Sequence, residues 1–311
     1  MDSLLFISVF VEICLPIAVL AAAGWAVDRL CGLDLRTLVK ININVVVPAF
    51  IFVRVMESEL AGAAAARIMF FTLTVIALMF VAGEIAGRLS KEPAERRRSL
   101  QMATMFYNSG NYGLPLMTLA YPGVGPVMQV FVLLTQNIST FTVGLLLASS
   151  GGGQRGWRVW LPVLRQATLW GVLIAAGARL FDVPVTEWAW IWGPLNILAD
   201  ALVAVALFTL GVQLSQTDPR RALRHMRFPV PLRLLGGPLA AALLVPLFGF
   251  EGPAAAVLIL GAGVPTAVNI SFIAHEFRAD HAYLAAAVFY STLFSMITVT
   301  AVATILRLTV G

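Results

Sequence analysis

Two stretches of the chain place asparagine beside glycine and proline within apolar sequence. They read Asn108-Ser109-Gly110-Asn111-Tyr112-Gly113-Leu114-Pro115 and Gly261-Ala262-Gly263-Val264-Pro265-Thr266-Ala267-Val268-Asn269. Glycine tolerates unusual dihedral angles, and proline removes a backbone donor and clashes with the preceding turn, so we expect an interrupted helix at each stretch. The N-terminal end of a half-helix offers N–H groups and a positive dipole end to an anion, and freed carbonyl groups suit a cation. The sequence therefore predicts an ion-binding site built from these residues.

The rest of the chain has the composition of a membrane protein. Of its 311 residues, 59% are hydrophobic and 12% are charged, and the mean hydropathy is +0.89. An average soluble domain has roughly one quarter charged residues. A soluble core of this size cannot hide so much apolar surface, which excludes a cytosolic enzyme, a nucleic-acid-binding protein and a disordered chain.

Apolar runs of about 20 residues predict the helices that hold the two stretches. Eight are clear in the sequence: 4–27, 37–55, 67–88, 127–149, 161–181, 191–214, 229–248 and 283–306. Two more, 98–121 and 253–277, are long enough to span a bilayer but carry the polar stretches, which are expensive at mid-depth. The predicted fold is an all-α polytopic membrane protein.

The distribution of basic residues favours ten spanning helices. With all ten crossing, one side of the membrane holds 17 of the 21 basic residues: Arg29, Arg36, Lys40, Arg88, Lys91, Arg96, Arg97, Arg98, Arg155, Arg158, Arg165, Arg220, Arg221, Arg224, Arg227, Arg233 and Arg278. The positive-inside rule then places both termini on the outer side of a plasma membrane, the inner membrane of a bacterium. The basic residues of these loops account for the net charge of +5, so no nucleic-acid partner is needed to explain it.

The two halves of the chain are similar to each other. The run Val19-Leu20-Ala21-Ala22-Ala23-Gly24 recurs as Val172-Leu173-Ile174-Ala175-Ala176-Gly177, and Pro115 and Pro265 occupy matching places in their halves. Five helices is an odd number, so the second copy enters the membrane upside down, as in the inverted repeats of many secondary transporters. We expect repeats at 1–152 (helices 1–5) and 153–311 (helices 6–10), with helices 4 and 9 broken.

Other polar residues inside the predicted spans are candidates with open alternatives. Gln136 and Asn137 in helix 5 either complete the pocket or pack against a neighbouring helix. Asp200 in helix 7 and Glu12 in helix 1 are candidates for ion coupling, because an intramembrane carboxylate is costly without a partner, or they hydrogen-bond to another helix. No histidine pair has the i, i+4 spacing of a metal site, and the two cysteines are too few for one. We expect neither a metal nor a cofactor.

The first polar stretch, NSGNYGLPL from Asn108 to Leu116, resembles the signature of the auxin efflux carrier family, which includes plant PIN proteins and bacterial organic-acid permeases. VPTAVN, from Val264 to Asn269, resembles the second crossover of that family. The resemblance implies a scaffold of helices 1, 2, 6 and 7, a transport domain of helices 3–5 and 8–10, a homodimer and an elevator-like displacement. It places substrate contacts on Asn108 or Asn111 and on Asn269, with Thr266 in the same motif, and the crossover prolines at Pro115 and Pro265.

The leading hypothesis is a permease that moves a small organic anion, a malonate-, malate- or auxin-like carboxylate, by alternating access. Gly110, Gly113 and Gly263 would shape the breaks together with the two prolines. Alternatives are a sodium-coupled symporter resembling the bile-acid family and a membrane-embedded ligand sensor. An enzyme is not expected, since the sequence has no GxSxG or HExxH motif and no pairing of a nucleophile with a base. The substrate, the direction of transport and the coupling ion, proton or sodium, stay open.

Overall fold

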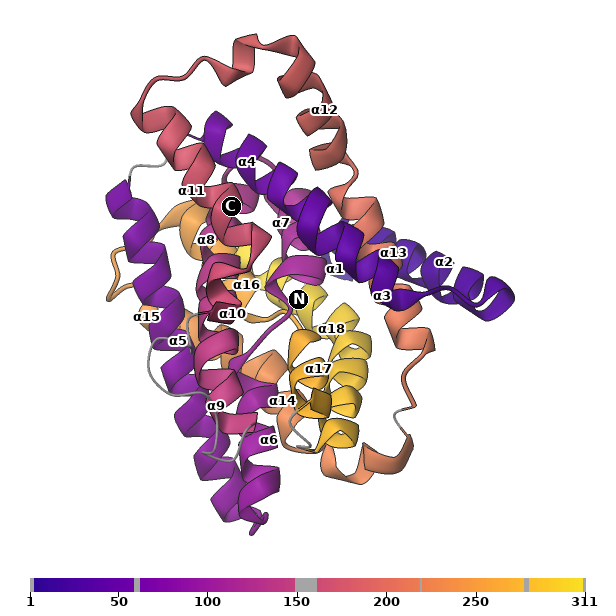
Figure 1. The fold of residues 1–311 in the computed structure, drawn as a ribbon. Helices are drawn as coiled ribbons and strands as arrows, with labels where there is room; N and C mark the ends of the chain where they lie inside the picture. Colours follow the sequence, from indigo (N-terminus) through magenta and orange to yellow (C-terminus); the bar gives the residue numbers. More distant parts are fainter. Residues whose placement is uncertain (1–2, 59–61, 149–160, 219, 277–279, 310–311) are drawn as a thin grey trace.

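Helices follow one another through the described chain in the computed structural model of the protein (Figure 1). The structure describes residues 3–58, 62–148, 161–218, 220–276 and 280–309. Within those ranges the β pairing consists of one isolated bridge, between Tyr107 and Thr266. The predicted all-α class is therefore confirmed for this part of the chain.

Six helical segments have the length and hydropathy needed to cross a membrane. They contain 23 to 29 residues each and span Ser3–Cys31, Leu35–Glu57, Gly62–Leu89, Val124–Ala148, Ala189–Ser215 and His281–Thr309. About 20 apolar residues are enough to cross the hydrocarbon core of a bilayer. These segments confirm a multi-pass membrane protein and coincide with six of the ten predicted ranges.

Several of these segments are composite helices. Their elements, in chain order, are α1 (Ser3–Val9), η1 (Phe10–Cys14) and α2 (Leu15–Cys31); α3 (Leu35–Ile41), η2 (Asn42–Val46) and α4 (Val47–Glu57); α5 (Gly62–Leu89); α8 (Val124–Ser139), η4 (Thr140–Gly144) and α9 (Leu145–Ala148); η6 (Val185–Glu187), α12 (Ala189–Asp200) and α13 (Leu202–Ser215); and α18 (His281–Thr309). Here η1, η2 and η4 are π-helical turns, and η6 is a 3₁₀ turn that precedes α12.

Shorter helices occupy the other four predicted ranges. They are α6 (Ala94–Met105), the π-helical turn η3 (Ser109–Gly113) and α7 (Leu114–Ala120); α10 (Leu161–Leu164) and α11 (Ala167–Leu180); α14 (Pro229–Pro231), the π-helical turn η8 (Leu232–Gly236) and α15 (Gly237–Leu244); and α16 (Gly252–Ala262) and α17 (Asn269–Glu276). The 3₁₀ turn η7 (Arg220–His225) precedes the third of these ranges. That these segments also cross the membrane, and that the halves are inverted repeats, stays a prediction.

Four of the π-helical turns have the same local cause. Each ends two residues before a proline: Pro16, Pro48, Pro115 and Pro238. Proline lacks an N–H group, and its ring clashes with the carbonyl group four residues earlier in a regular α-helix. A widened π turn directly before the proline relieves that clash, so the helix continues through it. Proline in these helices therefore marks a bulge and does not end the helix.

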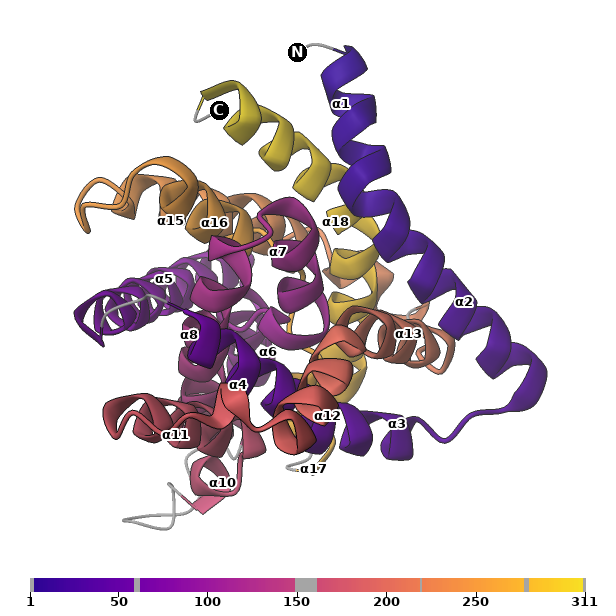
Figure 2. The same cartoon turned by 90° about the horizontal axis from the view of Figure 1, so that it is seen from above.

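One group of helices packs closely through small residues. α2 lies along α13, and α4 lies beside α11 and α12 (Figure 2). A Cβ atom at Gly211 of α13 would overlap the backbone carbonyl of Ala21 in α2, and one at Gly24 would overlap the carbonyl of Phe208. Such close backbone approach between glycines is typical of helix packing in membranes. We call α1–α4 and α10–α13 the first helix group.

The second helix group comprises the remaining helices, α5–α9 and α14–α18. α5 packs on α6 and α8, α15 on α16, and α17 on α18. The rings of Phe71, Phe248 and Phe250 meet edge to face, with centroids 5.4 and 5.7 Å from Phe71. The two groups also meet, since α1 packs on α18, and the ends of these two helices lie toward the same edge of the molecule (Figure 2).

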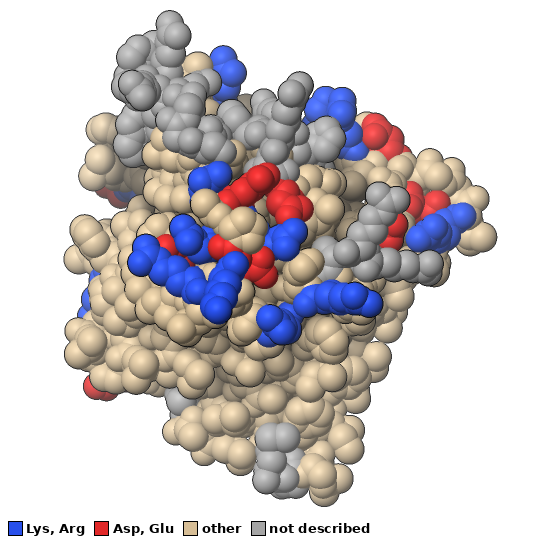
Figure 3. All heavy atoms as spheres, turned by 90° about the horizontal axis from the view of Figure 1, so that it is seen from below, with Lys and Arg blue, Asp and Glu red and all other residues tan. Residues whose placement is uncertain are grey.

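The outer surface is largely apolar, as a lipid-facing protein requires. Large hydrophobic side chains such as Leu30, Leu247 and Phe181 are 85%, 80% and 78% exposed. A soluble monomer rarely exposes contiguous apolar patches of this kind. Charged side chains instead gather on the face seen from below, near the end of α5 and the starts of α6 and α18 (Figure 3).

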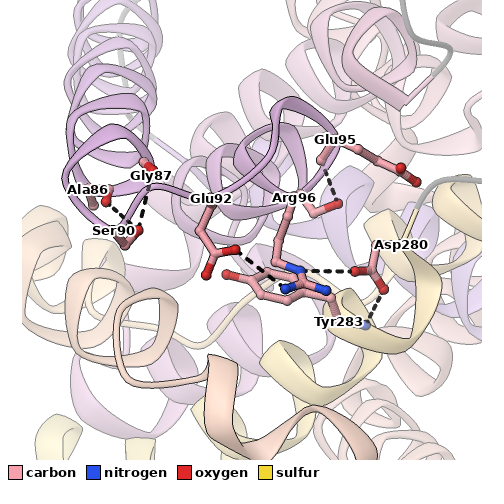
Figure 4. A network of polar contacts seen from close by, with 9 residues as sticks. Ala86, Gly87, Ser90, Glu92, Glu95, Arg96, Asp280 and Tyr283 are labelled. Atoms are coloured by element: carbon pink, nitrogen blue, oxygen red, sulfur yellow. Dashed lines mark hydrogen bonds and ion pairs between the residues drawn. The ribbon is translucent and has the colours of Figure 1, made fainter.

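A polar network on that charged face joins α6 to α18. Nη1 of Arg96 lies 3.4 Å from Oε2 of Glu92, and its Nε lies 3.6 Å from Oδ2 of Asp280 (Figure 4). Asp280 also accepts a hydrogen bond of 3.0 Å from the backbone N–H of Tyr283, in the first turn of α18. The network therefore anchors the start of the last helix to the helix that leads into the first polar stretch.

Candidate functional site

Both predicted interruptions are present, each as a short extended segment between two helices. In the first, residues 106–108 separate α6 from η3, and Phe106 has extended dihedral angles (φ −103°, ψ 125°). Asn108 caps the new helix, because its Oδ1 accepts a hydrogen bond of 3.2 Å from the backbone N–H of Asn111. In the second, residues 263–268 separate α16 from α17.

The two extended segments pair with each other as a minimal antiparallel ladder. The N–H of Asn108 donates to the carbonyl of Pro265 at 2.8 Å, and the N–H of Ala267 donates to the carbonyl of Phe106 at 3.0 Å. These bonds flank the bridge between Tyr107 and Thr266 symmetrically. Backbone groups released from a helix must find partners inside the protein, and here each interruption supplies them for the other.

The prolines and glycines of the two stretches do not act as the sequence predicted. Pro115 lies in the first turn of α7, after η3, whereas Pro265 lies in the extended segment itself. The bridge pairs Tyr107 with Thr266, so Phe106 precedes it in the first segment as Pro265 does in the second. That the two prolines match as crossover residues of two repeats stays a prediction. The π turn before Pro115 explains why the helix continues there.

Gly110, Gly113 and Gly263 all have negative φ angles, so none serves an unusual dihedral angle. The last two instead allow close packing. A Cβ atom at Gly113 would overlap the amide group of Gln129, and one at Gly263 would lie 2.9 Å from the ring of Pro238. Gly113 and Gly263 therefore serve the fold because they have no side chain, which lets the neighbouring groups approach closely.

A cavity of about 50 Å³ lies where the interruptions meet. Five of the six predicted substrate contacts line it: Asn108, Asn111, Gln136, Asn137 and Asn269. The sixth, Thr266, does not line it, because its hydroxyl is turned away and donates to the carbonyl of Ala103 at 2.9 Å. The sequence missed several lining residues: Ile43, Val47, Tyr107, Leu133, Thr140, Gln166 and Thr168. No lining residue is charged.

Two buried amide groups at the cavity have hydrogen-bonding capacity to spare. Gln136 is 2% exposed, and its amide lies beside the hydroxyl group of Tyr107, with no hydrogen bond of full geometry to its side-chain nitrogen or oxygen among the described residues. Asn108 is 6% exposed, and its Nδ2 is also without one. A buried polar group left unpaired costs roughly 1–3 kcal/mol, so such groups commonly mark a place that water or a ligand fills.

Helix directions add a positive electrostatic potential at the same place. η3 and α17 both begin at the cavity, since Ser109 and Asn269 are their first residues and line it. Helix N-terminal ends carry partial positive charge and favour anions. A cavity with amide donors, two helix N-terminal ends and no charged side chain suits a small anion.

Arg233 lies behind this cavity, and the sequence placed it wrongly among the loop residues that record topology. Its side chain is 0% exposed in η8, where it donates to the backbone carbonyls of Thr104 and Ala262. The guanidinium carbon lies 4.8 Å from the centroid of the Tyr107 ring, which also lines the cavity. Its position between leucines inside the apolar range 229–248 was the signal that could have found it.

The two carboxylates proposed for ion coupling lie elsewhere. Glu12 accepts hydrogen bonds from Ser8 at 2.6 Å and from Arg307 at 2.8 Å, which ties the first helix to the last. Asp200 is exposed at the end of α12. Neither residue lines the cavity. Within the described ranges, no group of three His, Cys, Asp or Glu residues is placed to hold a metal ion.

The membrane-spanning helices and the paired interruptions are features of a membrane transport protein. The sequence pattern of the family described as "Membrane transport protein" matches residues 157–303. An "Uncharacterized transporter" of Methanothermobacter thermautotrophicus is 26% identical over 296 residues, covering 92% of this chain and 95% of that protein. A "Putative malonate transporter" of Rhizobium meliloti is 26% identical over 253 residues, covering 76% of this chain and 74% of that protein.

These similarities agree with the motif from Asn108 to Leu116. Together, the family pattern and the two relatives support a permease of the auxin efflux carrier family.

Proposed function

We propose that the protein is a secondary transporter that moves a small organic anion, a mono- or dicarboxylate, across the bacterial inner membrane. The observation that carries the proposal is the cavity between the paired interruptions, where the side-chain nitrogens of Gln136 and Asn108 are buried donors with no hydrogen bond of full geometry among the described residues. A carboxylate accepts hydrogen bonds from amide nitrogens, and bonds to a charged acceptor are about twice as strong as neutral ones. The name of the Rhizobium relative, a malonate transporter, supports this substrate class.

The size of the cavity favours a small substrate. It encloses about 50 Å³. A water molecule needs roughly 10–15 Å³ of such space, so the cavity holds only a few groups of that size. Malonate, a three-carbon diacid, is much closer to this size than a sterol-sized acid, which would require a much wider opening. We therefore favour a short-chain carboxylate over a substrate of the bile-acid type.

The proposal includes an elevator-like movement of the second helix group past the first, with outer-side termini and a homodimer formed through the first group. Its support is the position of the cavity between the two groups. Residues of η2, α4 and the start of α11 line one wall, and residues of η3, α8, η4 and α17 line the other. Displacement of one wall against the other would open the cavity alternately to the two sides of the membrane.

The test is uptake of labelled malonate by the protein reconstituted in liposomes. Asn111→Ala and Asn269→Ala each remove one lining amide, and we expect a loss of roughly tenfold or more in initial rate, the size of one hydrogen bond to a charged group. Asn44→Ala is the matched control, because Asn44 is exposed and bonds only to the carbonyl of Lys40 in the described structure.

If both lining variants take up malonate at the wild-type rate, the assignment of the site to these residues is wrong. Malonate that raises the melting temperature without entering the liposomes would replace the transporter by a ligand sensor, since a ligand that binds the folded state stabilises it. Competition by unlabelled acids of increasing chain length then ranks the substrates. We expect competition to weaken once the acid outgrows the cavity.

A further inference from the structure

The guanidinium of Arg233 is buried without an acidic partner. The ion pairs among the described residues join Arg54, Arg88, Arg96, Arg97 and Arg307 to carboxylates, and none includes Arg233. A buried cation is expensive unless hydrogen bonds and opposite charge compensate it. Its compensation must come from the backbone carbonyls and the ring it contacts.

Those carbonyls lie at the C-terminal ends of two half-helices. Ala262 is the last residue of α16, and Thr104 is the second-last residue of α6. The last carbonyls of a helix have no partner within it and carry partial negative charge. Arg233 donates to one carbonyl of each end, so a single cation joins the two helices at the point where both are interrupted.

The surrounding chain is shaped to admit this side chain. Gly237 lies one helical turn after Arg233, and a Cβ atom there would overlap both the guanidinium and the carbonyl of Ala262. The ring of Tyr107 covers the guanidinium at 4.8 Å, a distance typical of a cation–π contact. Tyr107 also lines the cavity, so it contacts both the cation and the candidate site.

In transporters with interrupted helices, the C-terminal ends of half-helices and the unwound carbonyls beside them are where coupling sodium ions or protons bind. We infer that Arg233 is a built-in cation that takes this position, so that translocation needs no sodium ion there. The part of this inference that concerns translocation rests on the proposed function. The fixed positive charge behind Tyr107 also favours an anion in the cavity.

Sodium dependence and two substitutions test the inference. Malonate uptake is measured in sodium chloride and in choline chloride of the same ionic strength, for the wild type, Arg233→Lys and Arg233→Gln. Lysine keeps the charge, whereas glutamine keeps a donor and loses the charge. Arg227→Gln is the control, because Arg227 is an exposed arginine six residues earlier that lies over the ring of Phe228.

We expect wild-type uptake to differ by less than about twofold between the two salts, and Arg233→Gln to lose roughly tenfold or more, as for a broken hydrogen bond to a charged group. Arg233→Lys should recover a substantial part of the rate, which a purely space-filling role would not predict. Uptake that sodium stimulates roughly tenfold in the wild type would overturn the inference, as would a Gln variant equal to the wild type.

A second readout is independent of transport. If the wild type takes up no acid in any salt, the proposed function fails, and the melting temperatures of the same proteins decide the inference. We expect the order wild type, Arg233→Lys, Arg233→Gln, with no difference between sodium and choline in the wild type. A sodium-specific rise in the melting temperature of the wild type would show that a cation binds beside Arg233 and would overturn it.

Discussion

The side-chain nitrogen of Asn42 donates a hydrogen bond of 2.9 Å to the side-chain oxygen of Asn111. Asn42 is fully buried in the π-helical turn η2 of the first helix group, and Asn111 lies in η3 of the second. With its oxygen engaged, Asn111 turns its two N–H donors away from Asn42. The bond thus orients a proposed substrate contact and joins the two groups at the cavity.

Asn42→Ala should weaken substrate binding but not abolish it, because Asn111 itself remains. The hydrogen bond that orients Asn111 contributes about 0.5–1.5 kcal/mol, so we expect the KM for malonate uptake to rise about two- to tenfold. The measurement is the concentration dependence of uptake in liposomes. Asn44→Ala, two residues along the same turn but exposed, should leave KM unchanged. Equal KM values in the two variants would contradict the orienting role.

Gln136→Met separates binding from stability. In the empty protein this substitution removes a buried amide with no hydrogen bond of full geometry among the described residues, so we expect the melting temperature to stay the same or rise while malonate uptake falls roughly tenfold. Gln129→Met is the comparison, because Nε2 of Gln129 donates to the carbonyl of Ser109 at 3.0 Å, only its Oε1 lacks a partner among the described residues, and the residue does not line the cavity. That variant should be destabilised. A lower melting temperature for Gln136→Met would indicate a structural role.

The lining asparagines could be predicted from the sequence because polar residues are rare within apolar spans. Asn108, Asn111 and Asn269 stood out beside glycine and proline, and the structure places all three at one cavity. Gln166 and Thr168 could not be found this way, since they lie near the start of α11 and reach the cavity only through tertiary packing. The local sequence pattern does not predict a contact of that kind.

Arg233 and Pro115 show where sequence rules compete. Arg233 follows Arg227 by six residues and looks like a loop residue under the positive-inside rule. The carbonyl groups at the two half-helix ends nevertheless accept its hydrogen bonds and so compensate its burial. Pro115 looks like a helix break, yet the π turn before it absorbs the clash. In both cases the deciding partner is a backbone group whose position depends on the fold.

Gly211→Ala tests the packing of the first helix group. The added methyl group would overlap the carbonyl of Ala21, so α13 and α2 must separate. Overpacking of this kind typically costs about 1–3 kcal/mol, and the melting temperature should fall. Gly177→Ala in α11 is the control, because nothing lies within 4 Å of its added Cβ atom. There, replacing glycine within a helix should stabilise by roughly 0.5–1 kcal/mol. Similar melting temperatures for the two variants would contradict the close contact.

A homodimer through the first helix group predicts a cross-link at Ile197. This side chain lies on α12 and is 72% exposed, whereas Leu293 on α18 of the second group is 57% exposed. The native thiols of Cys14 and Cys31 are first replaced by serine, and a single cysteine is then introduced at either position. Apolar side chains exposed to this degree are covered either by lipid or by another protein surface.

We expect oxidation in intact membranes to convert Ile197→Cys, but not Leu293→Cys, into a dimer on a non-reducing gel. Cα atoms must approach within about 7 Å for a disulfide to form, so the bond reports direct contact between two copies. A bifunctional maleimide of graded length extends the reach when the two thiols are farther apart. Dimers formed equally by both variants would indicate random collision, and dimers formed only by Leu293→Cys would move the interface to the second helix group.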